Sequence, residues 1–337
     1  MARLTKEGID GAGESEMNLP GGTEYHVPVL YAEVLDALQP VEGKLIVDCT
    51  LGGGGHSEAL LEAGATVIGV DQDPEAIHEA GERLAAYGDR FRVLCCSFAD
   101  APELLTKQGI TGVDGVLMDL GVSSHQLDTP ARGFSFQAEG PLDMRMNPEG
   151  LVRASDLVNT ASAEQLERIF KEYGEEPNAR RIAARVVRER AVSPLRTTLD
   201  LAGVVESVVP RRGRAHPATR VFQALRIAVN RELEVLSDAL ESFTDLLNGG
   251  GRMAVISFHS LEDRVVKQYF ARRSAEWMDR PEWNEARRNP ACIFKKVTGK
   301  PVVAGEEELE RNPRSRSAKL RVVEKLVNHW ILSNYEY

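Results

Sequence analysis

Short apolar runs and longer amphipathic stretches alternate along the first third of the chain. The short runs, bounded by Gly, Asp or Ser, predict buried strands at residues 45–48, 66–70, 91–95 and 114–119. The stretches between them predict helices at residues 56–63, 74–86 and 100–107. Strands and helices in this order are typical of a doubly wound, mostly parallel α/β sheet, whose ligand crevice lies at the carboxyl ends of the strands.

The pattern changes after residue 130. Residues 131–150 are rich in Gly, Pro, Met and Phe without a clear period, so we expect a loop that covers a cofactor and faces a substrate. Helical periods follow at residues 163–173, 178–190 and 199–208. We therefore predict an inserted helical substrate-recognition domain at residues 136–216, flanked by the two parts of a sheet domain, residues 25–135 and 217–337.

One long predicted helix returns the chain to the sheet. Residues 218–247 carry apolar positions at helical spacing, and Gly249 follows their end. A strand is predicted at residues 252–258. The run Ser260-Leu-Glu-Asp263 is a capping box, which predicts the start of a helix at residues 261–272.

The segment that joins the first two strands carries the clearest functional signal. Four glycines at residues 52–55 separate a strand that ends in Asp48 from a helix that opens at His56, and the next strand ends in Asp71. Glycines let a backbone turn tightly and approach a ligand, and a carboxylate at a strand end can accept hydrogen bonds from ribose hydroxyls. This arrangement predicts a nucleotide-type cofactor site.

The glycine spacing helps to separate two cofactor classes. A dinucleotide site holds a pyrophosphate through G-x-G-x-x-G, whereas these glycines are contiguous. S-adenosylmethionine carries a cationic sulfonium and amino group, which carboxylates at strand ends complement. Asp48, Asp71 and Asp119 are three such carboxylates, so the pattern favours S-adenosylmethionine. Phe98, after the third strand, either walls off the adenine ring or belongs to the core.

Charge is distributed unevenly along the chain. The formal net charge is −10, but residues 178–231 hold twelve arginines, three acidic residues and no lysine. Arginine binds phosphate through paired donors and stacks on bases, so this segment could contact RNA. A solvated helix surface is the alternative interpretation.

Composition also indicates in which cellular compartment the protein works. The four cysteines lack paired C-x-x-C spacing, so we expect free, buried thiols in a reducing cytoplasm and no structural zinc or other metal site. Residues 1–24 have no signal-peptide core, and no apolar run approaches bilayer length. We therefore expect a cytosolic protein without membrane contact, with a disordered tail at residues 1–24.

Several separate motifs together resemble one family. They are His26-Val-Pro-Val-Leu30, Gly52 to Ser57, Asp119-Leu-Gly-Val-Ser-Ser124, Gln126-Leu-Asp128, Arg132-Gly-Phe-Ser-Phe136, Gly140-Pro-Leu-Asp-Met-Arg-Met146, His216-Pro-Ala-Thr-Arg220 through Asn230, Ser257-Phe-His-Ser-Leu-Glu-Asp263 and Asn312-Pro-Arg-Ser-Arg-Ser-Ala-Lys-Leu320. From about residue 25 to residue 323 the chain closely resembles the bacterial RsmH (MraW) family. It departs from that pattern in its N-terminal tail and in His125, where relatives often have Pro.

The resemblance implies a class I, Rossmann-like methyltransferase that uses S-adenosyl-L-methionine. The implied reaction methylates the exocyclic N4 of one cytosine in 16S ribosomal RNA, in the decoding region of the small ribosomal subunit. It also implies an antiparallel pair of final strands, for which residues 292–297 and 318–325 are candidates. The oligomeric state stays open.

Motif positions and residue types together give the candidate site. The cofactor candidates are Gly54, Gly55, His56, Asp71, Phe98, Asp119 and Gln126, and Asp119 is also the catalytic candidate. The substrate candidates are Arg132, Asp143, Arg145, His216, Arg220, Arg226, Asn230 and His259. The substrate candidates either contact RNA or pack within the protein. This applies also to those spaced three or four residues apart along the long predicted helix.

The chemistry of the implied reaction fits the loop after the fourth strand. The lone pair of cytosine N4 is delocalised into the ring, so a catalyst must supply acceptors for the amino hydrogens and align the amine with the methyl donor. Residues 119–124 offer a carboxylate, carbonyls and hydroxyls. Methylation at C5 would need a cysteine nucleophile, and the dipeptide Pro-Cys does not occur in the sequence.

Two other functions compete with RNA methylation. A nicotinamide oxidoreductase is disfavoured by the contiguous glycines and by the lack of a recognisable hydride-transfer site. A ribosome-assembly factor that binds RNA without catalysis would keep the arginine-rich segment. It would not need Gly54, Gly55, His56 and Asp71 together.

Overall fold

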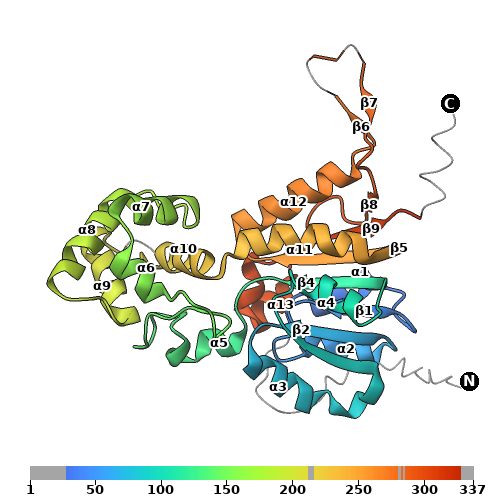
Figure 1. Ribbon diagram of the computed structural model, residues 1–337, viewed down its shortest axis with the longest axis horizontal. Helices are drawn as coiled ribbons and strands as arrows, with labels where there is room; N and C mark the ends of the chain where they lie inside the picture. Colours follow the sequence, from blue (N-terminus) through green and yellow to red (C-terminus); the bar gives the residue numbers. More distant parts are fainter. Residues whose placement is uncertain (1–27, 212–215, 280–281, 284, 328–337) are drawn as a thin grey trace, which may run out of the picture.

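The computed structural model describes residues 28–211, 216–279, 282–283 and 285–327, so the tail predicted at residues 1–24 lies outside the described part. Its centre is a seven-stranded sheet with the order β3-β2-β1-β4-β5-β9-β8 (Figure 1). The strands are β1 (Leu45–Asp48), β2 (Thr66–Asp71), β3 (Phe91–Cys95), β4 (Val113–Asp119), β5 (Leu247–Ser257), β8 (Phe294–Lys296) and β9 (Lys319–Lys325).

The sheet is mainly parallel, as the sequence predicts. Strands β1 to β5 pair in parallel, whereas β9 runs antiparallel to both β5 and β8. The early strands are almost continuously apolar because successive residues point into different cores. In β1, Ile46 belongs to the core on one face of the sheet, and Val47 belongs to the core on the other face.

Helices cover both faces of this sheet. Those packed on it are α1 (Tyr31–Leu38), α2 (Gly55–Glu62), α3 (Pro74–Arg83), α4 (Ala101–Lys107), α11 (Glu232–Leu246) and α12 (Ser260–Ser274). A short helix, α13 (Glu306–Arg311), and the 3₁₀ turn η3 (Pro313–Ser317) precede β9. A small antiparallel pair, β6 (Trp277–Met278) and β7 (Arg287–Arg288), projects from the end of α12 (Figure 1).

A second lobe consists of helices and has its own core (Figure 1). Its helices are α6 (Ala154–Thr160), α7 (Ala163–Glu172), α8 (Ala179–Val192), α9 (Thr198–Val208) and α10 (Thr219–Asn230). Phe170, Ile182 and Leu201 are fully buried there, and Phe134 and Phe222 join the same core. The packed unit therefore extends beyond residue 216 to include α10.

The prediction of one helix over residues 218–247 is wrong. The chain forms α10 and α11, with a break at Arg231, which has left-handed backbone angles of φ 50° and ψ 39°. The apolar face of α10 packs in the lobe core and that of α11 packs against the sheet, so the two helices must point differently. The apolar period runs through the break without interruption, so the sequence carries no local stop signal.

Cysteine burial also differs from expectation. Only Cys49 is buried among the four, while Cys95 is exposed and Cys96 and Cys292 are half-buried. Cys95 and Cys96 lie at the end of an edge strand, where fewer neighbours cover them. Among the described helices, none has the length and apolar character needed to cross a bilayer.

Candidate functional site

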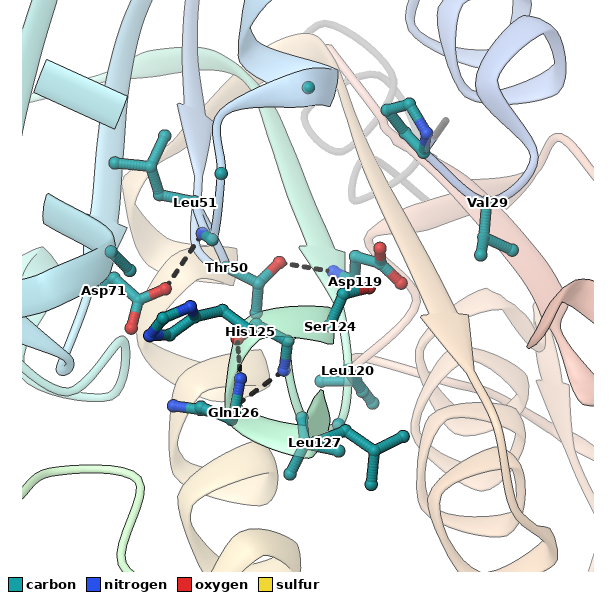
Figure 2. Close-up of a pocket in the computed structure, with 18 of the residues that line it drawn as sticks. Val29, Thr50, Leu51, Asp71, Asp119, Leu120, Ser124, His125, Gln126 and Leu127 are labelled. Carbon is teal, nitrogen blue, oxygen red and sulfur yellow. Dashed lines mark hydrogen bonds between the residues drawn. The ribbon is translucent and has the colours of Figure 1, made fainter. Parts of the chain in front are cut away.

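A cavity of about 620 Å³ opens at the carboxyl ends of β1, β2 and β4 (Figure 2). This volume lies within the range of cofactor pockets. The walls come from the glycine turn after β1, the ends of β2 and β4, α5 (Ser124–Asp128), part of α10 and the turn η3. The site thus lies where the topology of an open α/β sheet predicts it.

The glycine turn needs glycine for both backbone shape and space. Gly52 and Gly54 have φ values of +48° and +80°, which side chains disfavour. A Cβ atom on Gly55 would lie 2.4 Å from Cγ of Pro28, and one on Gly54 would lie 3.0 Å from a methyl carbon of Leu84. Gly55 lines the cavity, whereas Gly54 faces the helix behind it. Gly54 therefore shapes the turn from outside the cavity.

Asp71 at the end of β2 fastens the glycine turn. Its two carboxylate oxygens accept hydrogen bonds from the backbone N–H groups of Gly52 and Asp73, both at 2.9 Å (Figure 2). Burial raises the pKa of Asp71 to about 6, and the charges of Asp73 and Asp48 add to the rise, while the two N–H groups oppose it. Each oxygen keeps a second lone pair for a ligand.

This raised pKa predicts how stability depends on pH. Because the folded-state pKa of about 6 exceeds the ordinary 3.8, the folded protein binds a proton between these values that the unfolded chain does not. The free energy of unfolding should therefore fall as pH rises from about 4 to about 6, by roughly 3 kcal/mol from this group alone. Urea unfolding of wild type and Asp71→Asn across this range would measure the difference. The exposed Asp238→Asn is the control.

Asp119 and His56 form the opposite wall. The Asp119 backbone N–H donates to Oγ1 of Thr50 at 2.7 Å, which ties the end of β4 to the turn after β1 (Figure 2). His56 is buried, and its Nε2 lies 3.6 Å from Asp119 Oδ2. Oδ1 of Asp119 and both ring nitrogens of His56 are buried without a hydrogen-bond partner among the described residues. Groups in this state fit a polar ligand in the cavity.

Asp73, which the sequence analysis missed, binds both Gln126 and the predicted substrate residue Arg132. Gln126 Nε2 donates to Asp73 Oδ2 at 2.9 Å, and Arg132 Nη1 donates to the same oxygen at 2.6 Å. Asp73 is almost fully buried and also caps α3 by accepting from the Glu75 N–H. The Asp-Pro pair that starts α3 signals the cap, but nothing nearby in sequence reveals the Arg132 partner.

Other substrate candidates bind within the protein. Arg145 binds Asp143 through Nε and Nη2, both at 2.7 Å, and donates to the carbonyl of Gly150. The Asn230 side chain donates to the Met144 carbonyl at 2.8 Å and accepts from Met146 N–H at 2.8 Å. These contacts order the loop that leads from the cavity to the helical lobe.

His216 and Arg220 lie farther from the cavity, outside its lining. His216 stacks on Phe136 with ring centroids 4.5 Å apart, and its Nε2 lies 2.9 Å from a carboxylate oxygen of Glu206. Arg220 is exposed and donates to the carbonyl of Glu175. Of the cofactor candidates not yet placed, Phe98 lines the cavity and is half-buried.

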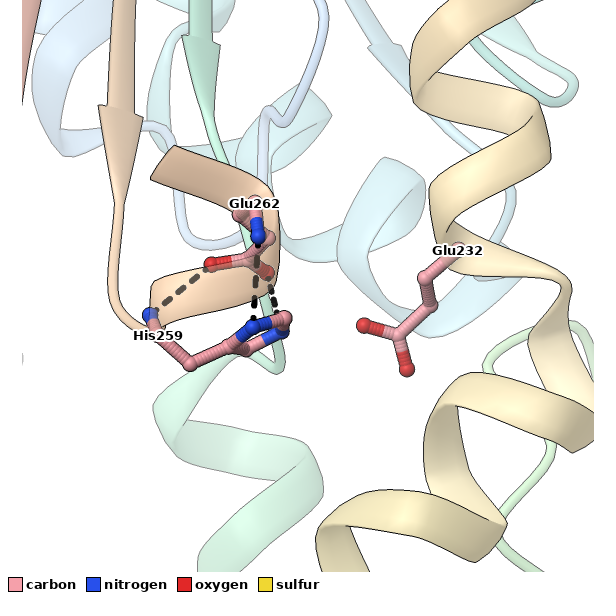
Figure 3. A group of neighbouring side chains, drawn as sticks. All are labelled: Glu232, His259 and Glu262. Atoms are coloured by element: carbon pink, nitrogen blue, oxygen red, sulfur yellow. Dashed lines mark hydrogen bonds and ion pairs between the residues drawn. The ribbon is translucent and has the colours of Figure 1, made fainter. Parts of the chain in front are cut away.

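Glu232, His259 and Glu262 lie near one another at the starts of α11 and α12 (Figure 3). Arg226 binds both oxygens of Glu232 at 2.9 Å and lies 3.9 Å from Glu262, while His259 Nε2 lies 3.0 Å from Glu262. Burial raises the pKa of Glu232 more than Arg226 lowers it. Ligand atoms of Glu232, His259 and Glu262 lie within 4.8 Å of one another, close enough for a metal ion. We assign no metal ion to this cluster, because the guanidinium of Arg226 already balances the charge of Glu232.

The fold and cavity together define an α/β enzyme with a nucleotide-type cofactor site. A model of the MraW methylase family matches residues 23–326, and the chain belongs to that family. It is a methyltransferase, and its cofactor is S-adenosyl-L-methionine, as the sequence analysis predicted.

Curated relatives agree with this assignment. The chain is 51% identical over 314 residues to ribosomal RNA small subunit methyltransferase H of Trichlorobacter lovleyi, covering 90% of this chain and 98% of that protein. It is 50% identical to the protein of the same name in Geobacter sulfurreducens, covering 89% and 99%. A solved rRNA methylase of Streptococcus thermophilus is also similar, with a TM-score of 0.38 and 11% identity over 88% of this chain and 93% of that one.

Proposed function

We propose that this enzyme transfers a methyl group from S-adenosyl-L-methionine to the exocyclic N4 of a specific cytosine in 16S ribosomal RNA, in the decoding region of the small subunit. The names of the relatives support the ribosomal RNA of the small subunit as substrate. The observation that carries the N4 assignment is Asp119, whose buried Oδ1 has no partner among the described residues and borders the cavity.

The cavity suits a cationic cofactor with a ribose. When bound, S-adenosylmethionine supplies an electrophilic methyl group. Asp71 would accept hydrogen bonds from the ribose hydroxyls, and Phe98 would cover the adenine ring. Gly55 would let the backbone approach the cofactor. The carboxylates of Asp71 and Asp119 would complement the cationic groups of the cofactor, the sulfonium and the amino group.

Asp119 would act on the target amine. A carboxylate oxygen that accepts an N4 hydrogen draws electron density back to the nitrogen and fixes its direction toward the methyl group. His56, 3.6 Å from the other oxygen of Asp119, would hold that carboxylate in place.

Covalent chemistry at C5 is disfavoured by the one thiol at the cavity. Among the described cysteines, Cys49 alone lines it. Burial raises the pKa of the Cys49 thiol well above its ordinary value, and the charge of Asp48 adds to the rise. A thiol in this state is a poor nucleophile, since the thiolate is the reactive form. This supports direct transfer to the exocyclic nitrogen.

The exposed arginines of the helical lobe would bind the RNA backbone. Arg180, Arg188 and Arg211 are exposed, whereas Arg190 donates to the carbonyls of Val158 and Ala161 and supports the lobe itself. Arg212 and Arg214 belong to the same arginine-rich segment as Arg211, but both lie outside the described residues.

Reversing Arg180, Arg188 and Arg211 to Glu should weaken RNA methylation while leaving cofactor affinity unchanged. Phosphate contacts depend on counterion release, so the variant, which makes fewer of them, should respond less to salt, and its defect relative to wild type should shrink as salt rises. Methylation rates between 50 and 200 mM salt, in about the range where such contacts weaken, would measure it. The control reverses the exposed Lys295, Lys296 and Lys300 at the β8 edge of the sheet domain. Equal effects of the two triple variants would argue against the lobe as the RNA surface.

Tritium transfer tests the function as a whole. Small subunits from cells that lack the enzyme should gain label from tritiated S-adenosylmethionine, and the labelled nucleoside should run with N4-methylcytidine. Binding without transfer would favour an assembly factor. Label in 5-methylcytidine would refute the proposed chemistry.

A further inference from the structure

The motif Asn312-Pro-Arg-Ser has no part in the function proposed above, yet it forms a wall of the cavity. Asn312, Pro313 and Arg314 line the cavity together with Ser124 of α5. Side chains within the motif fix its shape. Asn312 Oδ1 accepts from the Arg314 N–H at 3.2 Å, and the buried Ser315 hydroxyl donates to the Asn312 carbonyl at 2.7 Å. The 3₁₀ turn η3 therefore presents Arg314 in a defined direction.

Arg314 connects this turn to α5. Its Nη2 donates to both carboxylate oxygens of Asp128, at 2.8 and 2.9 Å, and its Nη1 donates to Ser124 Oγ. One guanidinium nitrogen thus contacts the Asp128 carboxylate and the other contacts the Ser124 hydroxyl, and the two contacts together fix the direction of the guanidinium. On its other side, α5 is held by the hydrogen bond of 2.9 Å from Gln126 to Asp73. The short helix that follows the Asp119 loop is thus clamped from two directions.

The chemistry of arginine determines what the Ser124 hydroxyl can do. A guanidinium has donors and no acceptor, so Ser124 Oγ must accept in this contact. A hydroxyl that accepts one hydrogen bond still has its own hydrogen to donate. Among the described residues, none accepts from Ser124 Oγ, and this side chain lines the cavity. Its hydrogen is therefore available to a ligand in the cavity.

We propose that Arg314 is a positioning residue that presents the Ser124 hydroxyl as a hydrogen-bond donor to the target base. The inference rests on the proposed function and specifies how the base is recognised. Cytosine has an acceptor, N3, beside its exocyclic amine, whereas uracil carries an N–H group at that position. A fixed hydroxyl donor would form a hydrogen bond with N3 of cytosine. In uracil it would face the N–H group, and polar sites strongly reject a base that leaves two donors facing each other.

A double-mutant cycle tests this arrangement in the full-length enzyme. Ser124→Ala and Arg314→Ala should each lower kcat/KM for methylation of small subunits about tenfold, the effect of one lost hydrogen bond. S-adenosylmethionine affinity, measured by calorimetry, should stay within twofold of wild type. The double variant should be no slower than the slower single variant, because Arg314 acts through Ser124. Ser124→Thr keeps the hydroxyl and should retain most of the activity.

Arg321→Ala is the matched control. It removes another arginine–carboxylate contact, with Asp263 at 2.7 Å, from a position outside the cavity lining. It should lower the melting temperature without changing kcat/KM. If Arg314→Ala does not fold, Ser124→Ala, which removes one oxygen atom, tests the inference alone.

Two results would overturn the inference. The first is a Ser124→Ala enzyme within twofold of wild type, and the second is full additivity in the double variant. Wild-type enzyme that forms no N4-methylcytidine on small subunits would instead refute the proposed function. Wild-type activity with an equally active Ser124→Ala variant would refute the role of Ser124 alone.

Discussion

Asp119→Asn should reduce turnover on small ribosomal subunits by on the order of 10²-fold or more, with a melting temperature near that of wild type. The substitution keeps the shape of the side chain but removes the charge and one of the acceptor oxygens. The backbone of Asp119 is held by Thr50 at 2.7 Å, so the loop should not move. Single-turnover tritium transfer together with thermal melting would measure both quantities.

Asp114→Asn provides the control, since Asp114 lies on the same strand at the end away from the cavity. Its carboxylate accepts from the Leu45 N–H at 3.1 Å, so its loss affects the sheet and not the site. Normal turnover of Asp119→Asn would contradict the proposed role. The chemistry would then depend on positioning by the backbone of residues 122–126.

The parallel sheet could be predicted because its signal is local. Strands β1, β2 and β4 are each a short apolar run that ends at an Asp, and both of their faces are buried. The positions of Asp71 and Asp119 followed from the same signal, because the carboxyl ends of neighbouring parallel strands share one edge. A single rule of topology therefore located both residues at the cavity before any contact was known.

The break at Arg231 could not be predicted for the opposite reason. Nothing in the apolar period marks it, and the left-handed angles at a non-glycine residue are imposed by packing in two separate cores. The same holds for the partners of Arg132. This residue was a substrate candidate, but its side chain binds the carboxylates of Asp73 and Glu75, which lie 59 and 57 residues away in sequence. Pairing at that distance is visible only in the folded chain.

Arg314 illustrates a further limit. Its contacts with Ser124 and Asp128 span 190 and 186 residues, and both groups lie in motifs that the sequence analysis had already singled out. Motif resemblance therefore identified the right segments but could not show that they meet. Only the topology, which brings η3 from the C-terminal part of the chain to the edge of the cavity, joins them.

Asp71→Ala should weaken S-adenosylmethionine binding by roughly 1.5–3 kcal/mol, which corresponds to about a 10- to 150-fold rise in Kd. Two effects contribute. The ribose hydroxyls lose a charged acceptor. The Gly52 N–H also loses its hydrogen bond of 2.9 Å to Asp71, which holds the turn that shapes the cavity. Calorimetry at pH 7 would measure the change. Unchanged affinity in a folded variant would rule out Asp71 as a cofactor residue.

The pH dependence of binding separates Asp71 from a merely structural contributor. Because the pKa of Asp71 is about 6, the carboxylate is ionised at pH 7 and mostly protonated at about pH 5. A ligand that needs the ionised form should bind wild type more weakly as pH falls through this range, whereas Asp71→Ala should lack that loss. Affinity that falls equally in both proteins would assign the pH dependence to another group. The loss of affinity in Asp71→Ala would then reflect the released turn.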